Sequence, residues 1–401
     1  MTQKVVIIGH GFTSRLAVTR SVAQIGCEVT LIVLTGYRKS CRNELNTRKP
    51  IDGYSKYVSR ILYCYAKDEE GLIHLLLSEC ADPSQKVVII PDSDFSAAAI
   101  DRNQERLKDD FLFPHIHYTP GAVVEWMDKV KQKDLARQVG MNVAGANVIA
   151  VKNHQYSIPS TVSYPCFTKP LTTIGVGKRL LKRCNDEKEL RAILDEAGDI
   201  GNLQVLVEDF KSIDNEYAVL GVSDGKEVVI PGIIQILVMA HGGHYGVACQ
   251  GKVMPVAGFE EFISQFKEFI LRIGYVGLFD IDFYESNGVL YFGELNLRFG
   301  GSGYAVTKMG VNLPAMFVKI CLGDEWKDPI LEIKDSAVYV NERMVMDEWR
   351  NGFITYKEFK KFLSTSDVHF ISDDVDYRPE IHFKHKIYWQ MVINIVKTIK
   401  K

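Results

Sequence analysis

The first part of the chain alternates short apolar runs with helical patterns. Val5–Ile8, Val29–Leu34 and Val87–Ile90 are rich in β-branched and aliphatic residues and are typical of buried strands. The spacing of apolar positions from Ser14 to Ile25 predicts a helix between the first two strands. Short buried strands separated by helices indicate a parallel α/β unit, which we place at residues 1–118.

The pattern becomes mixed after this unit, and a longer α+β domain is predicted at 119–325. A helical pattern over Val123–Val139 places Lys129, Lys133 and Arg137 four residues apart on one face. A polar-faced helix is predicted at Glu187–Glu196. Six strands are predicted at Pro165–Pro170, Val205–Glu208, Tyr217–Val222, Val228–Val238, Gly277–Tyr284 and Val289–Asn296.

The last part of the chain, residues 326–401, is predicted to be a small mixed module that ends in a basic helix. Ile387, Met391, Ile395 and Ile399 form an apolar stripe at four-residue spacing. We expect this helix to dock on its own domain. The alternative is an interfacial helix held at an anionic membrane.

Composition excludes several classes of protein. The formal net charge of -2 gives no global electrostatic case for nucleic acid. The eight cysteines show no close pair at zinc or redox spacing, which favours reduced thiols. The first apolar run is too short for a signal peptide, and the longest, Val228–Ala240, is too short for a transmembrane helix. We therefore expect a cytoplasmic protein without a transmembrane segment.

The turn at Gly9–Ser14 invites comparison with a dinucleotide-binding fingerprint, and we reject that interpretation. Ser14 stands where the third glycine would be, and Thr35-Gly36 follows the second strand where a ribose-binding acid is needed. An oxidoreductase is thus disfavoured. We interpret the turn as a helix-capping turn, with a backbone nest for an anionic substrate group as the alternative.

The strongest chemical signal is a pair of carboxylates near the end of the second domain. Glu294 and Asn296 lie two residues apart on a strand and share a face. The turn signal Asn287-Gly288 precedes that strand. A two-residue loop there would set Asp282 opposite Gly293, whereas an odd loop or a bulge would set it opposite Glu294. In the second case the oxygens form a hard site suited to Mg²⁺, and this is our prediction.

Two weaker features precede this pair. Lys169 at a strand end is followed by a glycine-bearing loop, 172–178, that can hold phosphate oxygens but lacks the P-loop pattern. Taken alone, this feature is better interpreted as an ordinary surface hairpin. The strand that ends at Glu208 leads to Asp209 and, further on, to Glu216. Backbone groups at this strand end can bind the edge of adenine, and Glu216 can accept hydrogen bonds from ribose hydroxyls. The alternative is a strand end with solvated acids.

Taken in order, these features resemble the ATP-grasp superfamily over roughly residues 1–324. The resemblance implies a Rossmann-like N-terminal (pre-ATP-grasp) domain and a two-subdomain ATP-grasp fold whose lid covers about 150–212. It also implies ATP as the nucleotide and Mg²⁺ as the metal, with Mn²⁺ as an alternative.

The resemblance also implies roles for the cations. Lys129 and Lys169 match the two nucleotide lysines, and Lys252 matches, more loosely, a cation near the γ-phosphate. Arg298 completes the family's E-x-N-x-R pattern, which starts at Glu294, and would stabilise the transferring phosphoryl group. Lys169, Lys252 and Arg298 are thus the implied catalytic residues.

The nucleoside and the metal are assigned in the same way. Glu208, Asp209 and Phe210 match the adenine-binding linker, and Glu216 matches the acid that binds ribose. The metal ligands implied are those suggested by the strand pattern, namely Asp282, Glu294 and Asn296. Asp280, on the same face, is the reserve ligand.

The first domain narrows the resemblance. Tyr54–Tyr57 and Ile90–Asp94 are similar to uncharacterised ATP-grasp carboxylate–amine ligases related to D-aspartate ligase. The large subunit of carbamoyl phosphate synthase and biotin carboxylase are more distant relatives. The implied reaction activates a carboxylate as an acyl phosphate and passes it to an amine. Both substrates would be small molecules such as amino acids, and a homodimer is compatible with this resemblance.

Two alternatives stay open. The first is activation of bicarbonate, as in carbamoyl phosphate synthase, although that family normally duplicates its ATP-grasp module and this chain has length for one. The second is a nucleotide-binding regulator without turnover, against which the complete set of metal ligands argues.

Overall fold

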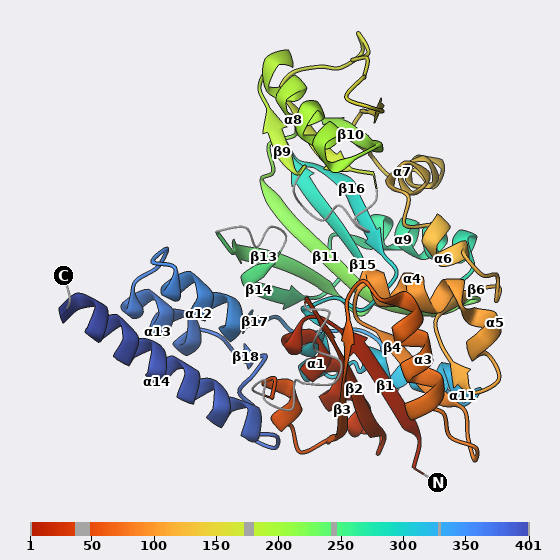
Figure 1. Ribbon diagram of the computed structural model, residues 1–401, viewed down its shortest axis with the longest axis vertical. Helices are drawn as coiled ribbons and strands as arrows, with labels where there is room; N and C mark the ends of the chain where they lie inside the picture. The colour runs from red at the N-terminus through yellow and green to blue at the C-terminus, as the bar shows by residue number, and fades with distance from the viewer. Residues whose placement is uncertain (1, 37–48, 172–179, 242–246, 328–329, 400–401) are drawn as a thin grey trace.

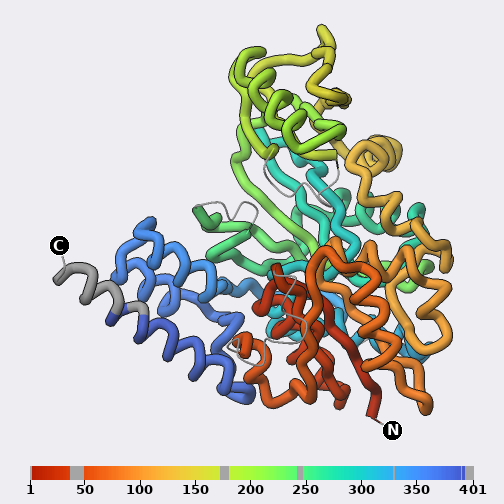
Figure 2. Tube along the Cα trace, viewed as in Figure 1, coloured from red at the N-terminus to blue at the C-terminus, as the bar shows by residue number. Residues whose placement is uncertain are grey.

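The computed structural model describes residues 2–36, 49–171, 180–241, 247–327 and 330–399, with side chains except at 390 and 393–399 (Figure 1). In this view the N-terminal sheet lies at the lower right, a small antiparallel sheet stands at the top, and the C-terminal helices lie at the left. A large sheet connects these parts (Figure 2). The chain therefore has a mixed α/β fold built on several sheets.

The N-terminal sheet has five parallel strands in the order β3-β2-β1-β4-β5, as the alternating pattern predicts. Its strands are β1 (Lys4–Gly9), β2 (Glu28–Thr35), β3 (Val58–Tyr65), β4 (Val87–Pro91) and β5 (Phe111–Leu112). Its helices are α1 (Phe12–Ala23), α3 (Glu69–Glu79), α4 (Asp94–Arg102), α5 (Gln104–Leu107) and the 3-10 turn η2 (Asp52–Tyr54).

The small sheet is antiparallel, in the order β7-β10-β8-β9. Its strands are β7 (Ala146–Val151), β8 (Cys166–Pro170), β9 (Lys182–Cys184) and β10 (Leu203–Asp209). Helix α8 (Glu187–Ile200) packs on it through Leu190, Ile193 and Leu194. The predicted phosphate loop at 172–178 lies outside the described residues.

The large sheet runs β16-β15-β11-β13-β14-β17-β18, with β6 and β12 attached at β15 and β11. Its central strands are β11 (Asn215–Asp224), β13 (Ile233–Met239), β14 (Ala248–Met254), β15 (Tyr275–Ser286) and β16 (Val289–Asn296), with β6 (His115–Ile116) and β12 (Val228–Val229). Helix α9 (Glu260–Ile273) covers one face. The other face shares a core with α10 (Gly303–Lys308), α11 (Leu313–Leu322) and the N-terminal sheet.

Two expected elements are each split in two. The strand expected over Val228–Val238 is interrupted at residues 230–232, because Pro231 has no N–H for a strand ladder. The helix expected over Val123–Val139 consists of α6 (Ala122–Glu125) and α7 (Lys129–Gln138). Asp128 separates them because its side chain caps the second helix.

The C-terminal residues do not form a separate body. Strand β17 (Ala337–Val340) pairs with β14, and β18 (Val368–His369) pairs with β17, so both extend the large sheet. Helices α12 (Glu342–Arg350), α13 (Tyr356–Ser364) and α14 (Arg378–Ile399) follow these strands.

Helix α14 is docked on its neighbours, as expected. Phe383 is buried and Ile387 packs against the same apolar cluster, which includes Met346 and Phe359. The side chains of Ile395 and Ile399 lie outside the described residues. No helix in the described part of the chain combines the length and the apolar character required to cross a bilayer.

Candidate active site

The hairpin of β15 and β16 brings the two predicted carboxylates together. The Ser286–Val289 pair closes a two-residue turn, and a bulge at Gly293 then shifts the register so that Asp282 pairs with Glu294. The prediction that both carboxylates share a face is confirmed, through a bulge rather than an odd loop. A Cβ at Gly293 would lie 2.7 Å from the carbonyl oxygen of Asp282, so glycine permits this close approach.

Two further side chains extend the row of oxygens. Asp280 pairs with Asn296 across the hairpin, and the Asn296 amide donates to Asp282 Oδ2 at 3.4 Å. Burial and the charge of Glu294 raise the pKa of Asp280 to about 6, although the charge of Arg298 opposes this rise. Burial and the charge of Asp280 likewise raise the pKa of Asp282. This excess of negative charge fits a hard cation.

Lys129 holds one of these carboxylates. Its side chain is almost fully buried, and its Nζ lies 2.7 Å from Glu294 Oε1. The helix that carries it is fixed to β16, because Gln132 exchanges two hydrogen bonds with the backbone of Leu295. In the described part of the chain no three His, Cys, Asp or Glu side chains are already arranged around a metal position, and Lys129 pairs with Glu294 instead.

A second group of charges lies across from the hairpin, on the small sheet. Glu208, 5% exposed, forms ion pairs with Lys133 at 2.5 Å and with Lys169 at 2.8 Å. Burial lowers the pKa of Lys133, whereas Glu208 outweighs burial at the more exposed Lys169 and raises its pKa. The charge of Glu294 also raises the pKa of Lys169, so the electrostatic field of the hairpin reaches this second group. The sequence placed Lys133 on the face of Lys129 but gave it no role.

The predicted adenine linker is engaged within the small sheet. The backbone N–H of Asp209 donates to Gly145 O at 2.8 Å, and that of Phe210 donates to Pro165 O at 3.1 Å. Arg183 lies over the Phe210 ring at 4.3 Å. Neither N–H is available to an adenine base in this arrangement, so an adenine edge would have to pair with other backbone groups of the linker.

Glu216 lies on the same face of the large sheet as the hairpin carboxylates. Glu216 pairs with Tyr284, and Ala218 pairs with Asp282. Because Tyr284 and Asp282 are two residues apart on β15, both pairs lie on one face of the sheet. Burial raises the pKa of Glu216, and Lys169 opposes that rise. The structure therefore brings Glu216 into the electrostatic field of the candidate site.

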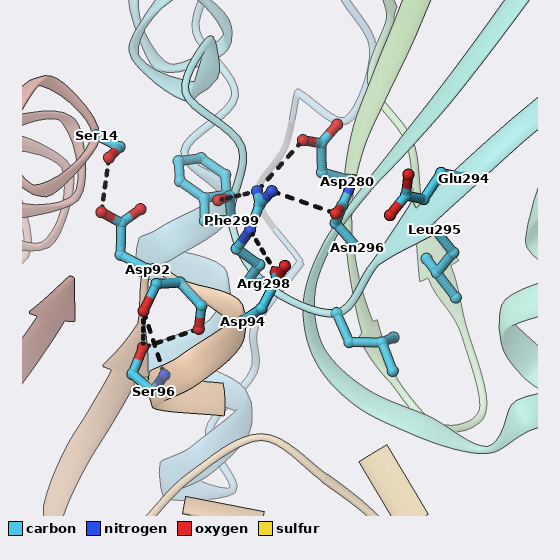
Figure 3. Close-up of polar contacts among 12 residues, drawn as sticks. Ser14, Asp92, Asp94, Ser96, Asp280, Glu294, Leu295, Asn296, Arg298 and Phe299 are labelled. Atoms are coloured by element: carbon cyan, nitrogen blue, oxygen red, sulfur yellow. Dashed lines mark hydrogen bonds and ion pairs between the residues drawn. The ribbon is translucent and has the colours of Figure 1, made fainter. Parts of the chain in front are cut away.

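Arg298 connects the hairpin to the N-terminal sheet. Strand β16 ends at Asn296, so Arg298 lies in the following turn rather than on the strand. Its Nε donates to Asp94 Oδ1 at 3.1 Å, its Nη1 lies 3.6 Å from Asp280 Oδ2, and its Nη2 donates to Asn296 Oδ1 at 3.2 Å (Figure 3). Burial alone would lower the pKa of Arg298, but Asp94 and Asp280 outweigh it and raise the pKa.

The Gly9–Ser14 turn also reaches this junction. Ser14 Oγ donates to Asp92 Oδ2 at 2.6 Å (Figure 3), and a Cβ at Gly9 would lie 2.7 Å from the same oxygen. Asp92 is 8% exposed, and burial raises its pKa to about 7. Gly11 caps α1 without a side-chain hydrogen bond. Sequence reasoning assigned no role to Asp92 or Asp94, although both belong to the Ile90–Asp94 motif.

Lys252 is a predicted site residue that the structure does not bring to this cluster. It pairs with Gln235, which pairs with Tyr217 and through it with Phe283. Phe283 is the neighbour of Asp282 on β15, so the residues paired with Phe283 lie on the opposite face of the sheet from those paired with Asp282. This is the face that α9 covers. Lys252 therefore points to the opposite side of the sheet.

No family model matches the chain. The chain is 24% identical over 265 residues to a carbamoyl phosphate synthase large chain from Gemmatimonas aurantiaca, covering 64% of this chain and 24% of the relative. It is 29% identical over 178 residues to the large chain from Campylobacter jejuni, which covers 43% of this chain and 16% of that relative. A C-terminal section of the Aquifex aeolicus large chain is 24% identical over 223 residues, covering 53% and 41%. The chain thus spans less than half the length of each of these relatives.

Solved structures with similar folds cover more of the chain. The biotin carboxylase domain of Hydrogenobacter thermophilus 2-oxoglutarate carboxylase, in complex with MgADP, ADP and bicarbonate, has a TM-score of 0.63 at 18% identity, covering 84% of this chain and 74% of that one. N5-carboxyaminoimidazole synthetase from Staphylococcus aureus, complexed with ADP, gives 0.61 at 16% identity, covering 88% and 86%.

An L-amino acid ligase from Bacillus licheniformis gives a TM-score of 0.58 at 17% identity, covering 84% of this chain and 79% of that one. All three are ATP-grasp enzymes. The chain has the ATP-grasp fold. The resemblance inferred from the sequence motifs is confirmed at this level.

Proposed function

We propose that the chain is an ATP-dependent carboxylate–amine ligase. The observation that carries this proposal is the row of Asp280, Asp282, Glu294 and Asn296 on paired strands, with lysines opposite and Arg298 at its end. This arrangement can bind a metal nucleotide on one side and a carboxylate substrate on the other. It favours turnover over a purely regulatory role, because the groups needed for phosphoryl transfer lie together.

Nucleotide binding requires the charged groups of the site to exchange partners. Asp282, Glu294 and Asn296 would hold Mg²⁺, with Mn²⁺ as an alternative, and Asp280 would be the reserve ligand. The metal, when bound, supplies charge neutralisation for the ATP phosphates. Lys129, released from Glu294, would then be free to contact a phosphate, as would Lys169 on the lid side.

The proposed reaction has two steps. A carboxylate oxygen attacks the γ-phosphorus of ATP, the bond to the β,γ-bridging oxygen breaks, and ADP leaves. The nitrogen of a neutral amine then attacks the acyl carbon, the bond to the phosphate oxygen breaks, and the amine loses a proton. The products are an amide-type bond, ADP and phosphate.

Arg298 and the lid have separate roles in this scheme. The Arg298 guanidinium lies at the junction between the metal row and the N-terminal sheet, where it can stabilise charge on the transferring phosphoryl group. The lid, residues 150–212, carries Lys169 and Glu208 and would exclude water that hydrolyses an acyl phosphate. Lys252 is left out because it lies on the other face of the sheet.

The substrates are proposed from the relatives. Similarity to an L-amino acid ligase and the motifs shared with relatives of D-aspartate ligase support amino acids as carboxylate and amine. We propose a pre-ATP-grasp domain at 1–118, an ATP-grasp domain at 119–325 and a C-terminal segment joined to its sheet. A homodimer is the proposed assembly, since one neighbour is described as a domain dimer.

Bicarbonate is the second candidate for the activated carboxylate. The similarity to carbamoyl phosphate synthase large chains and to a bicarbonate-bound biotin carboxylase domain favours it. In that case phosphate release would require bicarbonate before any other acid.

The test is a phosphate-release screen with MgATP against amino acids, small acids and bicarbonate, with products identified by mass. The proposal expects phosphate release that depends on one carboxylate and one amine and is lost in Glu294→Ala. Release that depends on bicarbonate alone supports the second candidate. Nucleotide binding without release under any condition would instead indicate a regulator.

A further inference from the structure

A basic groove lies away from the candidate active site, between η2, α12 and α14. It has a volume of about 500 Å³, within the range of small-molecule sites. Four cationic side chains line it: Lys49, Arg343, Arg350 and Lys386. No carboxylate is among its described lining residues, which distinguishes it from the candidate active site. Figure 2 shows α14 running beside α12 and α13 at this end of the molecule.

The two arginines are held in place by one carboxylate behind them. Asp347, whose side chain is 7% exposed, accepts from Arg343 Nε at 2.7 Å and lies 3.4 Å from Arg350 Nη1. Because these residues are four and three apart on α12, the arginines lie on one side of the helix. A guanidinium held this way keeps donors directed outward, and such donors match a phosphate bidentately. Asp347 therefore offsets one of the two arginine charges.

Aromatic rings complete the walls. The rings of Tyr54 and His382 stack with their centroids 3.4 Å apart, and Lys49 Nζ lies 5.1 Å from the Tyr54 centroid. Trp389 lines the groove on α14 and is 62% exposed. Partial burial and then the positive charges of His385, Lys49 and Lys386 lower the pKa of His382, which agrees with a local excess of cations.

The segments that form the groove are distant in the sequence but are held together by a buried ion pair. Arg20 Nε lies 3.0 Å from Asp376 Oδ2, and both side chains are buried. Asp376 also accepts from the backbone N–H of Lys56 at 2.9 Å. Asp376 precedes α14 by two residues, and Lys56 follows Tyr54 by two. This ion pair therefore fixes the start of α14 against the segment that carries Tyr54.

We propose that this groove is a second ligand site, which binds a phosphate-bearing small molecule with a planar ring. Arg343 and Arg350 hold the phosphate, Lys49 and Lys386 add charge, and Trp389 contacts the ring. The volume of the groove and its aromatic walls favour a soluble ligand. A phospholipid headgroup offers the same phosphate chemistry, and the experiment includes an arm for it.

The test measures binding of GMP and of inorganic pyrophosphate to the full chain by calorimetry and by tryptophan fluorescence. Arg350→Gln should weaken binding at least about tenfold, because the phosphate loses a charged bidentate donor. The fold should survive, since Arg343 still pairs with Asp347 and Arg350 is 46% exposed. The fluorescence change should disappear in Trp389→Phe, while calorimetry still shows binding.

Lys384→Gln is the matched control. Lys384 lies on the same helix, is 68% exposed and pairs with Glu380 outside the groove. Binding should stay within about twofold in this variant, because screened surface charges contribute little. It should also persist in Lys169→Met, which separates the groove from the candidate active site.

The outcomes decide between the sources of phosphate. GMP or pyrophosphate binding that is weakened by Arg350→Gln but not by Lys384→Gln supports a soluble ligand. Binding only to phosphatidylglycerol vesicles, with the same dependence on Arg350, retains the phosphate site and assigns it to a headgroup. Binding that is equal in wild type and Arg350→Gln, that is lost in Lys169→Met, or that is absent with every probe overturns the proposal.

Discussion

The candidate active site and the basic groove both gather cations where elements from distant parts of the chain meet, but they balance charge differently. In the active site each cation faces a carboxylate, as in Lys129–Glu294, Lys169–Glu208 and Arg298–Asp94. In the groove the described carboxylate lies behind the arginines instead. A ligand of the first site must therefore exchange partners with the protein, whereas a ligand of the second only has to be an anion.

The largest expected effect is on the candidate active site, where each cation faces a carboxylate. Glu294→Ala should weaken Mg²⁺-dependent ATP binding at least about 100-fold, roughly 2.8 kcal/mol, because a proposed metal ligand is lost. Calorimetry with ATP, with and without Mg²⁺, measures this. Glu261→Ala, an exposed acid on α9, is the control and should bind normally. Unchanged Mg²⁺-dependent binding in Glu294→Ala would show that the row of oxygens is not the metal site.

Substitutions of the two lysines that pair with Glu208 should have different effects on nucleotide binding and on stability. Lys169→Met should lower ATP binding or turnover about tenfold and stability by about 1 kcal/mol, because Lys133 still pairs with Glu208. Lys133→Met should cost more stability, about 2 kcal/mol, since its side chain is 4% exposed against 21% for Lys169. Urea denaturation and nucleotide titration of both variants test this. Equal effects on both quantities would contradict the distinction.

The bulge in the hairpin should be sensitive to a single methyl group. Gly293→Ala places a Cβ 2.7 Å from a backbone oxygen, which must move. We expect a loss of about 1–3 kcal/mol of stability, with weaker Mg²⁺-dependent binding, by thermal and urea unfolding. Gly301→Ala is the control, because a Cβ there meets nothing within 4 Å. If both variants behave alike, the hairpin tolerates the shift.

The pH dependence of stability tests the buried Asp92. Burial raises its pKa to about 7 from 3.8, so the folded protein retains this proton to higher pH than the unfolded chain. Its contribution to stability should fall as pH rises from about 4 to about 7, by at most about 1.4 kcal/mol per pH unit, and then level off. Urea unfolding of wild type and Asp92→Asn across this range measures it. A difference between the two proteins that does not change with pH would refute the assignment.

The elements that are local in sequence could be predicted, and the partners that are distant could not. The parallel strands follow from periodicity. The shared face of Asp282 and Glu294 was predicted only for an odd loop or a bulge, and the bulge at Gly293 that produces it depends on packing. Strand β3 was not predicted, because its side chains are largely half-buried or exposed and lack a clear pattern.

Long-range ion pairs were hidden for a different reason. Arg298 and Asp94 are 204 residues apart, and Lys133 meets Glu208 only once the small antiparallel sheet is folded. An isolated charged residue in a sequence gives no sign of its partner. Lys252 shows the converse, because a match to a family pattern does not specify which face of a strand the residue occupies.

The pairing of β17 with β14 has a consequence for how this protein can be shortened. A chain cut before residue 337 would lose β17 and β18, and with them the hydrogen-bonding partner of β14. Strand β14 would then become an open edge, and an open edge readily pairs with another chain. Such a truncated protein should aggregate through strand addition even if its nucleotide site is intact, so an isolated catalytic fragment must extend past His369.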